Sequence, residues 1–433
     1  MKTAFRKFKK GRIYSICLFF LSLLIISACS QKRGPEKSDN KFNWINDSEL
    51  NISNLPVTDS GYVAFDLSKS EIEKSQLSLD KLIDSFHYLE LNSAPNHFFG
   101  DIDKLLINDT LIFVLDSYIT KTVSIYDRET GNELVFLEPK GEGPGEFLEV
   151  YDIALDDNGE QLFLYDGRLS KLLAYDFHGR FQHEMKVPIR ATQFRHLNDS
   201  IYLWYTQGLS NDHISSINQS DISISDSLLM PKSVYSSDKI ASDFSDYRSR
   251  DYFFQNNRDT YYFPRFENSI YKFSGTKGEL QKIAEFNLND AGLSESDLEG
   301  TAIDFTAERR NDGKFFGFGS HIVTKDWMGV KFNRIGKSEF NLFYNKEADK
   351  LLFGEQIIFD KEGLPFYSFP LDCHGNDCVS VIKLHGLTLE TVDSFIEGFK
   401  KRGIYTVEIE DFIRSIEDFE QPVVMFFRFK EST

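Results

Sequence analysis

Short apolar runs separated by turn residues fill the middle of the chain, and the same plan recurs along it. Residues 109–131 and 160–179 each contain an apolar run that ends in Asp, a few polar or small residues, a second run that ends in Tyr-Asp, and a turn that ends in Gly. A further copy begins at Asp259. Apolar runs of this length between turn residues predict short antiparallel strands.

The repeat is about 50 residues long, a period typical of β-propeller blades. Four short strands cannot bury both faces alone, so the blades must stack around an axis. Two helical insertions, 291–300 and 388–418, leave about 300 residues, which predicts six blades. The second insertion has apolar spacing for two helices, and residues 423–429 form a closing strand after Pro422. The predicted fold is all-β: a six-bladed β-propeller over residues 61–433 with short helical insertions near the C-terminus.

The N-terminus has the pattern of a targeting segment. Basic residues precede an apolar run over residues 16–26, and the order Ile-Ser-Ala-Cys ends at Cys29. The run is shorter than the about 20 apolar residues that span a membrane. The order Ile-Ser-Ala-Cys resembles a bacterial lipobox. This resemblance implies that residues 1–28 are a lipoprotein signal peptide and that Cys29 carries lipid. An ordinary signal peptide is the alternative. Residues 29–60 are expected to hold the lipidated cysteine and a flexible, polar tether.

Net charge and composition restrict the classes of binding partner that are expected. The formal net charge is −18, and no basic stripe follows residue 33, so a nucleic-acid partner is excluded on electrostatic grounds. The chain has 41 Phe and 19 Tyr, whose flat rings pack well on sheets. The expected partners are a membrane, through the lipid on Cys29, and a peptide, glycan or protein ligand.

Cys373 and Cys378 bracket the turn sequence His-Gly-Asn-Asp. In an exported protein such a pair is expected to oxidise, so the sequence predicts a disulfide across a hairpin end. A metal site that uses His374 is the alternative. It is disfavoured because His374 directly follows Cys373 and no second ligand cluster is present in the sequence. No metal and no cofactor are therefore predicted.

The loop at residues 139–149 contains the sequence Gly-Glu-Gly-Pro-Gly-Glu-Phe and is expected to connect the outer strand of one blade to the inner strand of the next, near the channel mouth. In one interpretation, the backbone amides and acidic side chains of this loop form part of a ligand site. The candidate residues are Glu142, Gly143, Gly145, Glu146 and Arg168. The other interpretation, which we favour, is a plain connection in which Glu146 accepts hydrogen bonds from loop amides. Recurrent strand-end carboxylates are expected to accept turn amides in the same way; these are Asp116, Asp127, Asp166 and Asp176.

The stretch from Gly143 to Gly179 is similar to an NHL-type propeller repeat. Together with the lipobox and the closing PVVMFFRFK, the chain resembles the six-bladed β-propeller lipoproteins common in Bacteroidota. The resemblance implies a fold and a location in the cell envelope, but it implies no particular activity. Other blades lack the Gly-Pro-Gly-Glu element, and residues 210–251 follow no repeat. Ser227, in that irregular stretch, resembles a short O-glycosylation acceptor of the same bacteria.

Two functions are compatible with this sequence. The first is a non-enzymatic binding or scaffold lipoprotein, anchored in the cell envelope and expected at the outer membrane, that uses one face of the propeller; which face of that membrane it occupies stays open. The second is a metal-dependent hydrolase or lactonase, with a metal in the channel held by carboxylates from several blades. The first is favoured because no HExxH, G-x-S-x-G or Walker sequence is present, so no catalytic residue is predicted.

Overall fold

The structure is a computed structural model of the chain. It describes residues 40–431 except 98–99, 157–159, 199, 219, 238–250, 258, 265, 275–278, 299–306, 309, 335–338, 359–366, 383, 385–386, 404, 417 and 420. The predicted signal peptide and Cys29 lie outside the described residues. The chain forms two compact units, residues 1–46 and 47–433. In the first unit, a 3-10 helix covers Asn40–Phe42, and the Trp44 indole donates a hydrogen bond to the Lys41 carbonyl at 3.1 Å.

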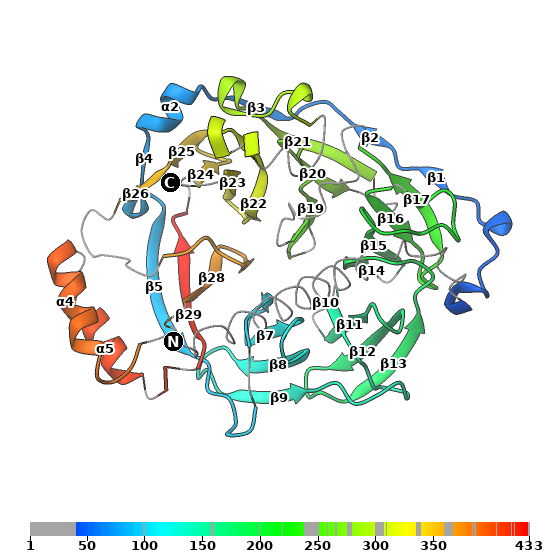
Figure 1. Ribbon diagram of the computed structural model, residues 1–433, viewed down its shortest axis with the longest axis horizontal. Helices are drawn as coiled ribbons and strands as arrows, with labels where there is room; N and C mark the ends of the chain where they lie inside the picture. Colours follow the sequence, from blue (N-terminus) through cyan, green and yellow to red (C-terminus); the bar gives the residue numbers. More distant parts are fainter. Residues whose placement is uncertain are drawn as a thin grey trace, which may run out of the picture. The chain divides into compact units, whose positions relative to one another are not determined.

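The second unit is a ring of six antiparallel blades, as predicted (Figure 1). Each blade has four main strands, and the first strand of each lies innermost. Blades 1 to 3 contain β6 Lys104–Ile107, β7 Leu111–Asp116, β8 Thr122–Asp127 and β9 Glu133–Leu137; β10 Val150–Leu155, β11 Gln161–Asp166, β12 Lys171–Asp176 and β13 Phe181–Lys186; and β14 Gln193–Asn198, β15 Ile201–Tyr205, β16 Ile222–Ser225 and β17 Pro231–Tyr235.

Blades 4 to 6 complete the ring. They contain β18 Phe253–Asn256, β19 Asp259–Tyr262, β20 Ser269–Ser274 and β21 Glu279–Asn287; β22 Phe315–Val323, β23 Trp327–Arg334, β24 Phe340–Asn345 and β25 Lys350–Gly354; and β27 Asp372–His374, β28 Asp377–Ile382, β29 Val423–Phe429 and β5 Ile83–Glu90. Blade 6 therefore combines C-terminal strands with β5, which comes from the N-terminal part of the unit. This pairing closes the ring and includes the predicted strand at 423–429.

A segment that we call the belt, residues 53–90, runs along the outer edges of blades 3 to 6. Its elements before β5 are β1 Ser53–Asn54, β2 Val57–Thr58, β3 Val63–Asp66, α2 Lys69–Lys74, β4 Gln76–Ser78 and η3 Leu79–Lys81. β1 pairs with β17, and both β2 and β3 pair with β21, in parallel. β4 pairs with the short strand β26 (Gln356–Ile358) beside blade 5.

The belt begins inside the range predicted to be a flexible tether. The Leu55 amide donates to the Val234 carbonyl at 2.7 Å, and the Leu280 amide donates to the Pro56 carbonyl at 3.1 Å. Leu55 itself is buried. Residues 53–54 and 57–58 are therefore paired strand residues, and the backbone between them is hydrogen-bonded to the same two blades, so residues 53–58 are not a free tether.

Two helices pack outside blade 6, within the predicted insertion 388–418. They are α4 Val392–Arg402 and α5 Val407–Ser415. The Phe412 ring of α5 stacks on Tyr88 of β5 with ring centroids 4.5 Å apart. In the described part of the other predicted insertion, residues 291–298, the helical elements are two short 3-10 turns, η4 Asn289–Ala291 and η5 Glu295–Leu298. A further 3-10 turn, η2, covers Asp47–Glu49 before the belt. Among the described helices, none is long and apolar enough to cross a membrane.

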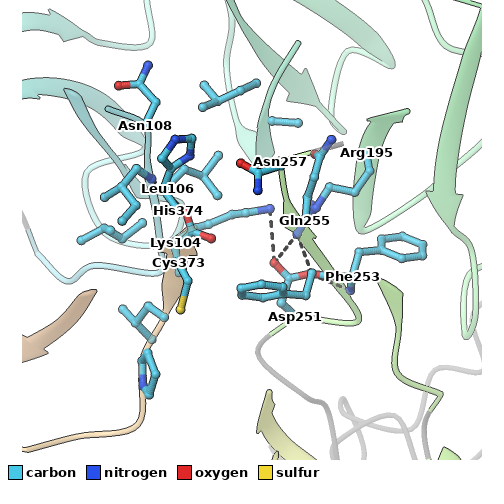
Figure 2. A pocket seen from close by; sticks show the side chains of 18 of the residues that line it. Lys104, Leu106, Asn108, Arg195, Asp251, Phe253, Gln255, Asn257, Cys373 and His374 are labelled. Atoms are coloured by element: carbon cyan, nitrogen blue, oxygen red, sulfur yellow. Dashed lines mark hydrogen bonds and ion pairs between the residues drawn. The ribbon is translucent and has the colours of Figure 1, made fainter. Parts of the chain in front are cut away.

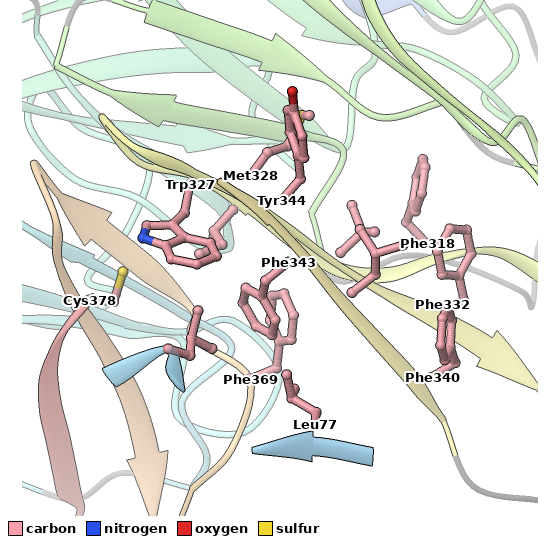
Figure 3. Close-up of a cluster of buried hydrophobic side chains, with 14 of the residues drawn as sticks. Leu77, Phe318, Trp327, Met328, Phe332, Phe340, Phe343, Tyr344, Phe369 and Cys378 are labelled. Carbon is pink, nitrogen blue, oxygen red and sulfur yellow. The ribbon is translucent and has the colours of Figure 1, made fainter. Parts of the chain in front are cut away.

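Aromatic side chains fill the space between and within the blades. Figure 3 shows one cluster, in which Phe343 and Phe369 stack with centroids 5.5 Å apart beside Leu77 of the belt. The strand-end carboxylates accept turn amides, as predicted: Asp166 Oδ2 accepts from the Leu148 amide at 2.6 Å. Asp116, Asp127 and Asp176 do the same at their own turns. These bonds fix the turns at the strand ends, and the Asp166–Leu148 bond also holds the segment that leads into the inner strand β10.

Candidate functional site

A cavity of about 590 Å³ occupies the channel and is lined by residues from the innermost strands of all six blades, β6, β10, β14, β18, β22 and β27. Its size is within the usual range of small-molecule sites. We call the end formed by the turns after these strands the mouth; Asp109, Thr110 and Asn257 lie there and are exposed. The opposite end, where several inner strands begin, is called the floor.

Four paired charges lie toward the floor, one from each of blades 1 to 3 and one directly before β18 of blade 4. Lys104 Nζ donates to Asp152 Oδ1 and lies 3.3 Å from Asp251 Oδ2. The Arg195 guanidinium lies 3.1 Å from Asp152 Oδ2 and 2.5 Å from Asp251 Oδ2. Figure 2 shows Lys104 and Arg195 converging on Asp251. We call these four residues the ionic cluster; its two cations and two carboxylates balance.

The side chains of the ionic cluster also form hydrogen bonds with backbone N–H and C=O groups of the inner strands. Asp152 Oδ2 accepts a hydrogen bond from the Phe194 amide at 2.8 Å, and Asp251 Oδ1 accepts one from the Phe253 amide at 3.1 Å. Arg195 donates to the Phe194 and Phe253 carbonyls at 2.6 and 2.9 Å. Buried polar groups need such partners, so the cluster ties neighbouring blades together at the axis.

A further carboxylate, Asp372 of β27, lines the same cavity. Its Oδ2 accepts a hydrogen bond from the Ile107 amide at 2.8 Å. Burial raises the pKa of Asp372 to about 7, because desolvation outweighs the stabilising amides and the nearby cations. Burial alone would also raise the pKa of Asp251, but Arg195 and Lys104 lower it to about 2. Asp251 is therefore ionised at neutral pH, whereas Asp372 titrates there.

The walls of the cavity combine apolar and polar side chains. Leu106, Phe253, Gln255 and Asn257 surround one space in Figure 2, together with His374 nearer the β27–β28 turn. His374 Nε2 lies 3.0 Å from Asp109 Oδ1. Apolar walls with a few polar groups are the usual composition of a ligand pocket.

The predicted disulfide is confirmed. Cys373 and Cys378 are bonded, with sulfurs 2.04 Å apart, and face each other as register partners on β27 and β28. Both are buried, and Cys373 lines the cavity. The bond therefore closes the hairpin that carries His374. Among the described residues, no group of three or more His, Cys, Asp or Glu side chains is arranged to hold a metal.

The Gly-Pro-Gly loop lies against the outer half of blade 2. Lys171 Nζ donates to the Gly143 carbonyl at 3.1 Å, and the Tyr175 hydroxyl donates to the Gly145 carbonyl at 2.7 Å. Both donors belong to β12, the third strand from the axis. Gly145 has φ of 70°, the left-handed conformation that favours glycine. The loop is thus a fixed connection between blades 1 and 2.

This position corrects the expectation that residues 142–146 lie at the channel mouth. The loop leads into the beginning of β10 at Val150, whereas the mouth is formed by the turns at the other end of the inner strands. None of residues 142–146 lines the cavity. Glu146 Oε2 accepts a hydrogen bond from the Gly143 amide at 3.0 Å, as the connection interpretation expects, and Glu142 is exposed.

The remaining candidates are also separate from the cavity. Arg168 lies in the β11–β12 turn with an exposed side chain, and its guanidinium is 3.7 Å from Glu149. Ser227 is exposed in the turn between β16 and β17.

The ionic cluster, His321 and Asp372 were not predicted from the sequence. Their signal was present: single charged or imidazole side chains interrupt apolar inner strands, where such groups are rare unless paired. The partners also lie about one blade apart, with separations of 48 residues for Lys104–Asp152, 43 for Asp152–Arg195 and 56 for Arg195–Asp251. A search for charges at the repeat period would have found them.

The fold and the cavity define the class: a six-bladed β-propeller with a ligand-sized central cavity. The sequence profile described as "Domain of unknown function (DUF4934)" matches residues 63–428, and the chain belongs to this family. No protein with a curated description matches the sequence.

The structure is similar to that of a candidate exported protein from Bacteroides fragilis, with a TM-score of 0.66, 14% sequence identity, and coverage of 86% of this chain and 100% of the other. At that identity the likeness shows the fold alone. A member of the DUF4221 family from Bacteroides vulgatus aligns with a TM-score of 0.42 at 9% identity, over 81% of this chain and 97% of the other, which carries no further argument.

Proposed function

We propose that the protein is a non-enzymatic binding module whose ligand enters the central cavity from the mouth. The observation that carries this proposal is the cavity itself: about 590 Å³, lined from all six blades. The charges near its floor are paired with one another. A scaffold of this kind holds lining groups in fixed positions, which lowers the entropic cost of binding.

We propose that the protein is located in the bacterial cell envelope and is anchored in the outer membrane through lipid on Cys29. Three observations support it. The order of residues 26–29 resembles a lipobox. The Cys373–Cys378 disulfide suits an oxidising compartment. The Bacteroides fragilis protein of the same fold is described as a candidate exported protein. The similarity of residues 143–179 to NHL-type repeats belongs to the same proposal.

A thermal-shift screen tests the binding proposal. The full chain is melted with defined neutral oligosaccharides and short peptides, and each compound that raises Tm is tested on two variants. Leu106→Trp adds bulk to the cavity wall, whereas Arg168→Trp adds the same side chain to the exposed β11–β12 turn. Binding at the cavity predicts a shift that Leu106→Trp abolishes and Arg168→Trp retains; Gln255→Trp provides a second block if Leu106→Trp fails to fold. A shift that survives both cavity variants would place the ligand elsewhere.

A further inference from the structure

His321 of β22 lines the cavity and is not used in the ionic cluster. Its side chain is 5% exposed, and its Nδ1 has no hydrogen-bond partner among the described residues. The ring stacks on Phe263 with centroids 3.6 Å apart, which fixes its orientation. Because His321 is part of the cavity wall, its imidazole is placed to contact a ligand there.

The imidazole of His321 is neutral. Burial lowers the pKa of His321 to about 3, well below the ordinary range of histidine. A neutral imidazole has one nitrogen that donates and one that accepts. A hydroxyl group, which also donates and accepts, complements it.

The rest of the cavity disfavours an anionic ligand. Lys104 and Arg195 are already paired with Asp152 and Asp251 near the floor. An anionic ligand would have to take one of these cations from its carboxylates and leave a buried charge uncompensated, which is costly.

The cavity also disfavours an extended peptide. A peptide strand would need free amides on the inner strands, as in strand addition at a sheet edge. The amides of Ile107, Phe194 and Phe253 instead donate to Asp372, Asp152 and Asp251. Recognition must therefore come from side chains.

We propose that the cavity binds the end of a neutral glycan, with His321 hydrogen-bonded to a sugar hydroxyl. The amide side chains of Gln255 and Asn257 offer further donors and acceptors, and Leu106 and Phe253 offer apolar surface for the C–H faces of a sugar ring. Alternating hydroxyls and C–H groups match this lining. This inference rests on the proposed function, since it names the ligand class of the same cavity.

The test uses isothermal titration of the full chain with maltotriose, xylotriose and chitotriose, with trialanine and trigalacturonate as peptide and charged comparisons. At least one neutral trisaccharide is expected to bind, and His321→Phe is expected to weaken it at least tenfold. The matched control is His196→Phe, since His196 is equally buried among aromatic rings but does not line the cavity. This control is expected to bind as the unmodified chain does.

A stability measurement separates a ligand contact from a structural role. Without ligand, the Tm of His321→Phe should equal or exceed that of the unmodified chain, because a partnerless polar group is removed while the ring stack remains. Equal sugar binding by His321→Phe, a large fall in its Tm, or no binding of any neutral probe would overturn the inference. If trialanine or trigalacturonate binds and Leu106→Trp abolishes that binding, the glycan class is wrong while the proposed function stands.

Discussion

The guanidinium of Arg195 contacts two carboxylates that reach it from neighbouring blades, and its side chain is only 4% exposed. Arg195→Met leaves Asp152 and Asp251 with Lys104 as their shared cation. Removing one partner from a buried ionic group typically costs about 3–5 kcal/mol of unfolding free energy. Arg168→Met is the matched control, because Arg168 is exposed and should change stability by no more than about 0.5 kcal/mol. Urea unfolding of both variants measures the difference; equal small losses would contradict the role given to the cluster.

A second single residue, Asp372, is expected to make the unfolding free energy depend on pH. Its pKa is about 7 in the folded protein, against an ordinary value of 3.8. Between these values the folded state binds the extra proton, so unfolding free energy falls as pH rises, by up to about 1.4 kcal/mol per unit, and levels off above the folded pKa. Asp372→Asn keeps an acceptor for the Ile107 amide but cannot titrate. Its stability relative to the unmodified chain should rise from pH 5 to pH 8 in urea unfolding. A difference that stays constant across this range would contradict the assignment.

Among the elements, the belt is the one whose structural role can be measured most simply. Phe65 of β3 is 9% exposed and stacks on Phe286 with centroids 5.0 Å apart. Phe65→Ala should cost about 3 kcal/mol of unfolding free energy, because it opens a cavity beneath the belt. Val63→Ala, on the same strand at an exposed position, should cost about 0.5 kcal/mol. Similar small losses in both variants would show that the belt contributes little to the fold.

The elements also show what the sequence could predict. The strand-end Asp residues repeat at the blade period, so the strands of blades 1 and 2 and the six-bladed ring followed from pattern. β1 and β2 did not, because two-residue strands that pair through backbone atoms have no apolar alternation to detect. The Gly-Pro-Gly loop was correctly recognised as the connection into the inner strand of blade 2, but its residues 142–146 do not line the cavity. A site in the channel was considered, but the residues that line the cavity were not predicted, because they come from six blades and only the ring brings them together.

At the scale of the whole molecule, the proposed lipid anchor decides where the propeller works. Cys29→Ala removes the sulfur to which the lipid would be attached, so the variant should leave the membrane fraction. Cell fractionation followed by immunoblotting measures this, and Cys17→Ala, within the predicted signal peptide, is the matched control that should stay membrane-bound. Retention of Cys29→Ala in the membrane fraction would contradict the proposed anchor.

The central claim is that ligand binds inside the ring and not at the Gly-Pro-Gly loop. A crystal structure of the full chain with the neutral trisaccharide that binds most tightly tests this directly. Sugar density is expected in the cavity within hydrogen-bonding distance of His321, with the Lys104–Asp152–Arg195–Asp251 pairs intact. Sugar density at residues 142–146, with the cavity unchanged, would contradict it.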